Sequence, residues 1–128
     1  MSFRILAVND DQAILDLYTT VLEEEGYTVS LALMEIENAK EVEQLHPDLI
    51  ILDLKMGRHN AGLLLLEQLR MYRPTKDIPV IICSAAVREI REQADVLQQK
   101  GIPVLYKPFD LDELLETVQR MLPPVPMM

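Results

Sequence analysis

Short apolar runs recur along the chain and are separated by longer segments of mixed polarity. Each run spans four to six residues and is rich in β-branched side chains, which is typical of a buried β-strand. The runs are FRILAV (3–8), YTVSLA (27–32), LIIL (49–52), PVIIC (79–83) and PVLY (103–106). Because all of them are too short for helices, we predict five strands.

The segments between these runs carry apolar side chains at helical spacing. Segment 12–25 has an apolar residue every fourth position and is followed by Gly26, which predicts a helix and its stop. Segment 110–122 follows the i, i+3, i+4, i+7 template and starts with Asp110 and Glu113 in a capping-box pattern. The other predicted helices are 35–45, 61–72 and 87–100.

Strict alternation of strands and helices defines the fold class. The runs at 3–8, 49–52 and 79–83 are apolar at nearly every position, so both faces of these strands are expected to be buried. A sheet buried on both faces is usually parallel and covered by helices on each side. We therefore predict an α/β domain of the doubly wound (βα)5 type.

Composition supports a single intracellular domain. With 128 residues and 49% hydrophobic content, the chain can bury an ordinary core without metals or disulfides. The only cysteine, Cys83, lies in an apolar run and is expected in the core, and no segment is long enough for a membrane span or a signal peptide. We expect a cytoplasmic folded domain over 1–122 and a disordered Pro-rich tail over 123–128, unless this tail begins a linker to a longer protein.

Polar side chains follow the predicted strands at their carboxyl ends. In an open α/β sheet, ligands bind beyond this edge, so residues distant in sequence are expected to meet there. The polar residues at these ends are Asn9, Asp10, Asp11, Asp53, Ser84 and Lys107.

The chemistry of this set points to phosphoryl transfer. Two carboxylates about 4 Å apart repel each other by roughly 4 kcal/mol at an effective dielectric constant of 20, so Asp10 and Asp53 need a cation or a shared proton. Carboxylate oxygens suit Mg²⁺, while the Lys107 ammonium and the Ser84 hydroxyl suit a phosphoryl group. A carboxylate oxygen can also act as a nucleophile and form an acyl phosphate.

Four segments resemble the receiver domain of two-component response regulators, of the chemotaxis-type single-domain kind, and the resemblance covers residues 3–122. They are ILAVNDD (5–11), PDLIILDLKM (47–56), IPVIICSA (78–85) and YKPF (106–109). The resemblance implies a flavodoxin-like sandwich with five parallel strands in the order 2-1-3-4-5.

The same resemblance implies roles for individual residues. Asp53 would accept a phosphoryl group from the phosphohistidine of a partner, and Ser84 and Lys107 would contact the phosphoryl oxygens. The implied ligands of Mg²⁺ or Mn²⁺ are Asp10, Asp53 and the Lys55 main-chain carbonyl, with Asn9 acting through a water. Such a domain is a signalling protein rather than an enzyme, with weak self-phosphorylation from small donors and weak autodephosphorylation.

Partners also follow from the resemblance. It implies a histidine kinase or a histidine phosphotransfer protein as the donor. A downstream effector would bind the face made by helix 4, strand 5 and helix 5, at roughly 86–119. We expect a bacterial protein that is a monomer or a weak dimer. A net charge of -9 argues against direct nucleic-acid binding by this domain.

Three departures from the family pattern affect these expectations. Asn9 stands where the family usually has an acid, so the metal site carries one charge less. Segment 56–62 has Gly57 in place of the common Pro and is one residue longer than the usual loop. Val104 occupies the position where the family usually has a Tyr or Phe that changes rotamer on activation.

Two other functions compete with a phosphorylated switch. A degenerate receiver would dock partners without phosphorylation, which Asn9 and Val104 favour and the acids and Lys107 oppose. A phosphatase with an aspartyl nucleophile would need a second acid two residues after Asp53, but this position is Lys55. His46 and His59 do not belong to any group of potential metal ligands in the sequence, and we predict that both are polar surface residues.

Overall fold

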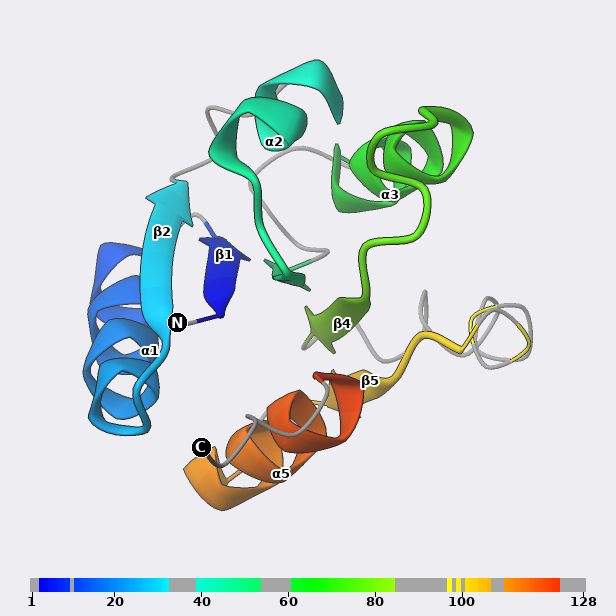
Figure 1. The fold of residues 1–128 in the computed structure, drawn as a ribbon. Coiled ribbons are helices and arrows are strands. Elements are labelled where there is room, and N and C mark those ends of the chain that lie inside the picture. The colour runs from blue at the N-terminus through cyan, green and yellow to red at the C-terminus, as the bar shows by residue number, and fades with distance from the viewer. Residues whose placement is uncertain are drawn as a thin grey trace, which may run out of the picture.

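Five parallel strands form one sheet at the centre of the molecule (Figure 1). The computed structural model describes residues 3–9, 11–32, 39–53, 61–84, 97, 99, 101–106 and 110–122; at positions 53, 61–63, 84 and 106 this covers the backbone only. The strands are β1 (Arg4–Val8), β2 (Thr28–Ala32), β3 (Leu49–Asp53), β4 (Val80–Ser84) and β5 (Val104–Tyr106). Their order is β2-β1-β3-β4-β5, which confirms the predicted order and makes β3 the central strand.

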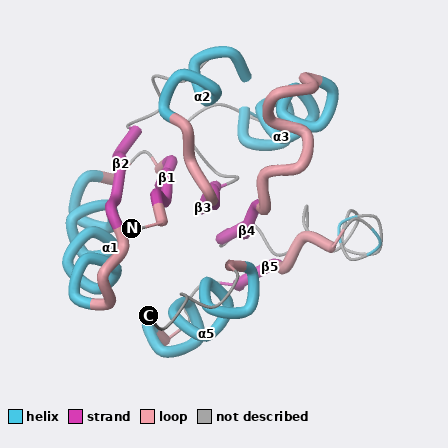
Figure 2. Tube along the Cα trace, in the orientation of Figure 1, coloured by secondary structure: helices cyan, strands magenta, loops and turns pink. Residues whose placement is uncertain are grey.

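Helices cover both faces of this sheet (Figure 2). The described helices are α1 (Gln12–Glu24), α2 (Ala39–Leu45), α3 (Ala61–Met71) and α5 (Leu111–Met121). In Figure 1, α2 and α3 lie on one side of the sheet and α1 and α5 lie on the other. The doubly wound arrangement is thus confirmed. The predicted helix at 87–100 and the tail at 123–128 lie outside the described residues, except that positions 97 and 99 are helical.

The core consists of two clusters, one on each side of the sheet. Successive residues of a strand point to opposite faces, so Ile50 and Leu52 pack below α2 and α3, whereas Leu49 and Ile51 pack below α1 and α5. All four side chains are at most 1% exposed. Burial of each such side chain contributes roughly 1.5–3 kcal/mol, which explains why the central strand is an uninterrupted apolar run. Cys83 is also fully buried, as predicted.

Helix α1 has a regular cap at each end. At its start, the Asp11 side chain accepts a hydrogen bond from the Ala13 N–H at 2.9 Å. At its end, Gly26 adopts a φ of 93° and donates its N–H to the Glu23 carbonyl, while Tyr27 donates its N–H to the Leu22 carbonyl. This pair of bonds is a Schellman motif, in which glycine supplies the left-handed residue. The predicted stop at Gly26 is therefore confirmed.

The start of α5 differs from the prediction. Asp110 is the N-cap residue, as expected, but its side chain makes no cap hydrogen bond. The contact to Glu113 runs through the main chain instead, because the Glu113 N–H donates to the Asp110 carbonyl at 3.0 Å. The capping-box pattern therefore located the helix start correctly but was wrong about the side-chain bond. Acids at 112 and 113 still lie in the first turn, where the helix dipole favours negative charge.

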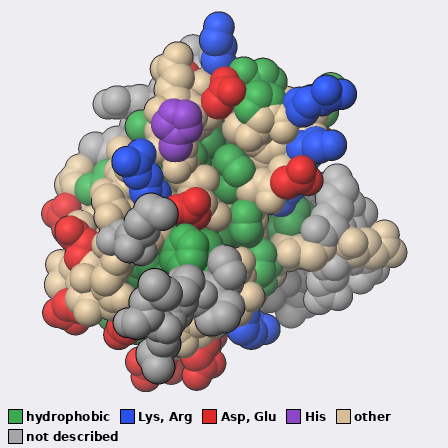
Figure 3. Space-filling model, in the orientation of Figure 1, with side chains coloured by type: hydrophobic (Ala, Val, Ile, Leu, Met, Phe, Trp, Pro, Cys, Tyr) green, Lys and Arg blue, Asp and Glu red, His purple; other side chains and the backbone are tan. Residues whose placement is uncertain are grey.

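Charged side chains are distributed unevenly over the surface. Asp and Glu side chains gather over α1 at the left of Figure 3, and several Lys and Arg side chains lie over α2 and α3. The exposed acids of α1 are Asp16, Glu23 and Glu24. Within the described ranges, no helix combines the length and the apolar character that crossing a membrane requires.

Candidate functional site at the carboxyl edge of the sheet

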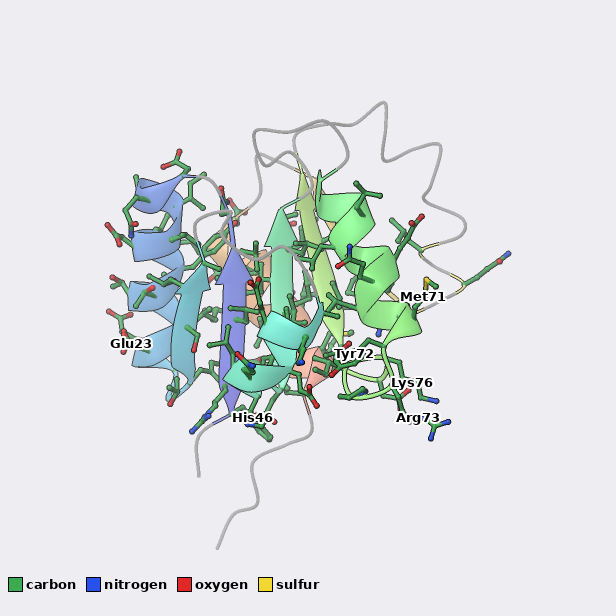
Figure 4. The ribbon with its side chains drawn as sticks, turned by 90° about the horizontal axis from the view of Figure 1, so that it is seen from above. Glu23, His46, Met71, Tyr72, Arg73 and Lys76 are labelled. Carbon is green, nitrogen blue, oxygen red and sulfur yellow. The ribbon has the colours of Figure 1, made fainter. Side chains whose placement is uncertain are left out.

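Strand register brings the predicted site positions to one edge of the sheet. All five strands point the same way, and Figure 4 shows their arrowheads directed to the same edge. Asp53 pairs with Cys83, and Ser84 pairs with Tyr106 one step further along. Val8 pairs with Leu52, so the next position, Asn9, lies beside Asp53. The backbone thus places positions 9, 53 and 84 together on neighbouring strands.

Asp53 is the last residue of the central strand. The sequence pattern predicts a strand that ends at Leu52, whereas the strand observed in the structure includes Asp53. Pairing with Cys83 extends the ladder by one residue, and the preceding Leu52 is fully buried. An unpaired charge inside an apolar core costs several kcal/mol. The end of the strand is therefore the position at which an acid avoids most of this cost. The acid therefore stands at the boundary between core and edge.

Asn9 follows β1 and is only 1% exposed. Its main-chain N–H donates to the Ala32 carbonyl at 3.1 Å, which extends the pairing between β1 and β2. Its side-chain Oδ1 accepts the Asp11 N–H at 3.0 Å. The Asn9 carboxamide therefore belongs to the turn that connects β1 with α1.

Asp11 has a structural role that the sequence analysis missed. The family resemblance implies no role for it in the metal or phosphoryl site, and in the structure it is the N-cap of α1. The signal was present, because an aspartate directly before a segment with helical apolar spacing is a common helix start. Asp10 lies between two residues that are both held by hydrogen bonds, Asn9 and Asp11.

Several residues named in the predictions, at the site or beside it, lie outside the described residues. They are Asp10, Lys55, Gly57, His59 and Lys107, together with the side chains of Asp53 and Ser84. Among the residues that the structure does describe, no group of three or more His, Cys, Asp and Glu side chains could hold a metal. The roles assigned to these residues stay predictions, and the observed part of the site is its backbone frame and Asn9.

Two further positions are described. Val104 begins β5, is half-buried and packs against the core cluster below α2 and α3. His46 precedes β3 and therefore lies at the opposite edge of the sheet, with an exposed side chain (Figure 4). This confirms the prediction that His46 is a surface residue.

The fold and the position of Asp53 define a class of protein. The chain is a doubly wound α/β domain in which an acid ends the central strand, at the edge where such sheets bind their ligands. The sequence model of the response regulator receiver domain matches residues 5–119. The chain therefore belongs to the family of response regulator receiver domains of two-component signal transduction.

Individual relatives agree with this assignment. A "DNA-binding dual master transcriptional regulator RpaA" of Synechocystis is 37% identical over 119 residues, which cover 93% of this chain and 48% of that protein. The receiver domain of a response regulator from Bermanella marisrubri is 28% identical, with a TM-score of 0.79 and coverage of 94% of this chain and 98% of that one. The chemotaxis protein CheY4 of Vibrio cholerae is 27% identical, with a TM-score of 0.77 and coverage of 95% and 100%. The chain spans about half the length of the curated relatives that it matches.

Proposed function

We propose that this receiver domain is a phosphoacceptor switch that takes a phosphoryl group from a histidine kinase, or from a histidine phosphotransfer protein, onto Asp53. One observation carries this proposal. Asp53 ends the central strand of the sheet, next to Cys83 and one step from the pair formed by Ser84 and Tyr106. An acid in this place stands at the carboxyl end of the central strand, and this is the edge where α/β sheets bind ligands.

The set of donors fits a hard divalent cation. Asp10, Asp53 and the Lys55 main-chain carbonyl offer only oxygen ligands, which suit Mg²⁺ or Mn²⁺ better than zinc or copper. We assign Asn9 to the same site as a neutral member that acts through a water. When bound, the cation would offset the repulsion between the two carboxylates and the negative charge of the phosphoryl oxygens.

The proposed reaction needs only the side chains at this edge. A carboxylate oxygen of Asp53 attacks the phosphorus of the donor phosphohistidine, and a new O–P bond forms. The N–P bond breaks, and its electron pair stays on the histidine nitrogen, which then takes up a proton. Lys107 supplies positive charge and Ser84 a hydroxyl hydrogen bond to the phosphoryl oxygens. Water later hydrolyses the acyl phosphate slowly to the Asp53 carboxylate and inorganic phosphate, which ends the signal.

Partners and location form part of the same proposal. We place the protein in the cytoplasm, as a monomer or weak dimer, with an effector on the face made by helix 4, strand 5 and helix 5. The Synechocystis relative is named as DNA-binding, but this chain matches only 48% of its length. The chain carries a net charge of -9, which repels a phosphate backbone. We therefore propose that the receiver domain itself does not bind DNA.

Intact-mass analysis after incubation with acetyl phosphate and Mg²⁺ tests the phosphoacceptor directly. We expect the wild type to gain the mass of one phosphoryl group and to lose it again slowly. Asp53→Asn should gain none, because an amide cannot form the acyl phosphate. Asp77→Asn is the matched control, since Asp77 is an exposed residue that precedes β4 and so lies at the opposite edge of the sheet, and it should be labelled like the wild type.

Two outcomes would contradict the proposal. An unchanged mass of the wild type at saturating donor and Mg²⁺ would leave a docking module without phosphorylation as the better explanation. Full labelling of Asp53→Asn would move the acceptor to another residue.

A further inference from the structure

The Asn9 side chain makes a contact that ties the predicted metal site to the fold. It is 1% exposed, and its Oδ1 accepts the Asp11 N–H at 3.0 Å. Asp11 in turn caps α1 through its bond from the Ala13 N–H at 2.9 Å. A short chain of hydrogen bonds therefore runs from the end of β1 to the first turn of α1.

The main chain of Asn9 is held as well. Its N–H donates to the carbonyl of Ala32, the last residue of β2, at 3.1 Å. The residue is thus attached to β2 through its backbone and to α1 through its side chain. Asp10, a proposed metal ligand, is the next residue in the sequence. A change in the bond between Asn9 and Asp11 therefore acts on both residues that flank Asp10 in the sequence.

The neutral charge of Asn9 has a further consequence. A carboxylate could accept the same N–H, but it would place another negative charge in a buried position beside the acids of the site. Such a charge is tolerated when a cation is bound and is unfavourable when none is present. A carboxamide accepts the same hydrogen bond without adding charge, so the bond does not depend on a bound cation.

We propose that Asn9 is a positioning residue of the metal site, whose buried carboxamide holds the turn between β1 and α1 and does so whether or not a cation is bound. This inference rests on the proposed function, because it concerns the affinity of the same site for Mg²⁺. It adds a role that is separate from contact with the metal through water.

Two measurements on variants of the chain test the inference. The first is the melting temperature in EDTA and in Mg²⁺, and the second is the dissociation constant for Mg²⁺ from calorimetric titration. Asn9→Ala should melt at a lower temperature in both buffers, because the Asp11 N–H loses its acceptor. It should also bind Mg²⁺ about tenfold more weakly, as is common when a residue that orients a metal ligand is removed.

Asp48→Ala provides the matched control. The Asp48 carboxylate accepts the Arg4 N–H at 2.7 Å, so it makes the same kind of bond at the opposite end of β1. We expect this variant to lower the melting temperature as well but to leave the Mg²⁺ dissociation constant unchanged. The comparison separates a positioning role from a general loss of stability.

Asn9→Asp tests the role of charge. It retains the acceptor but adds a buried negative charge, so we expect a lower melting temperature than wild type in EDTA, recovery in Mg²⁺ and severalfold tighter Mg²⁺ binding. An Asn9→Ala variant that binds Mg²⁺ within twofold of a wild type that does bind it would overturn this inference alone. Absence of Mg²⁺ binding by the wild type would overturn the proposed function and this inference together.

Discussion

His46 adopts a backbone conformation that is uncommon for residues other than glycine. Its φ is 50°, in the left-handed region, and it directly follows α2. Its N–H donates to the Glu43 carbonyl at 3.1 Å, which closes the helix end in the way that glycine usually does. Because the side chain is exposed, nothing in the described packing requires a histidine there. The strain remains in the fold without an apparent gain in stability.

We predict that His46→Gly stabilises the protein by about 0.5–1 kcal/mol. A left-handed backbone costs an L-residue about 1–2 kcal/mol, while the greater freedom of glycine in the unfolded chain offsets part of the gain. Urea unfolding at pH 7 measures the difference. Gln44→Gly is the matched control, since it lies in α2 and should cost about 1 kcal/mol instead. Destabilisation by both variants would show that the conformation at position 46 carries no strain.

At the scale of the elements, a hydrogen bond connects α2 with Tyr72, the residue that follows α3. The Tyr72 hydroxyl donates to the Glu43 carboxylate at 2.6 Å, across 29 residues of sequence. This hydrogen bond raises the pKa of Tyr72 above its ordinary value, and burial and the negative charge of Glu43 add to the shift. The bond therefore stabilises the fold fully below the ordinary tyrosine pKa of about 10, and its contribution is lost as pH rises through the raised pKa.

Tyr72→Phe is expected to reveal this dependence on pH. We predict that the wild type is more stable than the variant from pH 6 to 9 and that the difference shrinks at higher pH, because only the wild type must give up the proton of Tyr72. Unfolding free energies across pH 7–11 test the prediction. Glu43→Gln should also weaken the alkaline loss, since it removes the charge that raises the pKa. A difference that stays constant up to pH 11 would contradict the role of the bond.

The connection from α3 to β4 is held by side chains that bind main-chain carbonyls. Thr75 is fully buried, and its hydroxyl donates to the Leu69 carbonyl at 2.8 Å. Arg70 donates to the carbonyls of Lys76 and Ile78 at 2.6 and 3.0 Å. These bonds satisfy main-chain acceptors after the helix end and lead the chain into β4, which ends at Ser84. They therefore help to set where the carboxyl end of β4 lies.

At the scale of the whole molecule, the central sheet separates two core clusters. If Asp53 is the phosphoacceptor that we propose, a change there has to reach the surface through this packed structure. Val104 is half-buried against the cluster below α2 and α3, in the strand that pairs with β4. It is too small to follow a moving Ser84 in the way an aromatic ring does. We therefore expect the backbone at the end of β4 to carry more of the change than any ring rotation.

Amide chemical shifts with and without beryllium fluoride test this expectation. In the presence of Mg²⁺, we predict that the shifts change at 53–60 and also along 84–106, including the amide of Val104. Asp53→Asn should show neither set of changes and serves as the control. Changes confined to 53–60 would show that this receiver does not signal through the face of helix 4, strand 5 and helix 5.

The sequence by itself determined the strands and helices that the structure describes, and it predicted the edge of the sheet at which ligands are expected to bind. Five apolar runs and helical spacing between them are local patterns, and the stop at Gly26 follows from the conformational freedom of one residue. Burial of both faces of strand 49–52 could be predicted from the sequence because every side chain there is apolar. The edge followed as well, since parallel strands have their carboxyl ends on the same side.

Only the tertiary structure decided the contacts between segments. The bond between Tyr72 and Glu43 and the bond from the Arg4 N–H to Asp48 join residues 29 and 44 positions apart, and no local pattern specifies such pairs. A short-range detail also departed from the local pattern, because the Asp110 side chain makes no cap hydrogen bond at the start of α5. The burial of Asn9 belongs to this group, since a polar residue after a strand can face solvent or core, and the surrounding strands decide which.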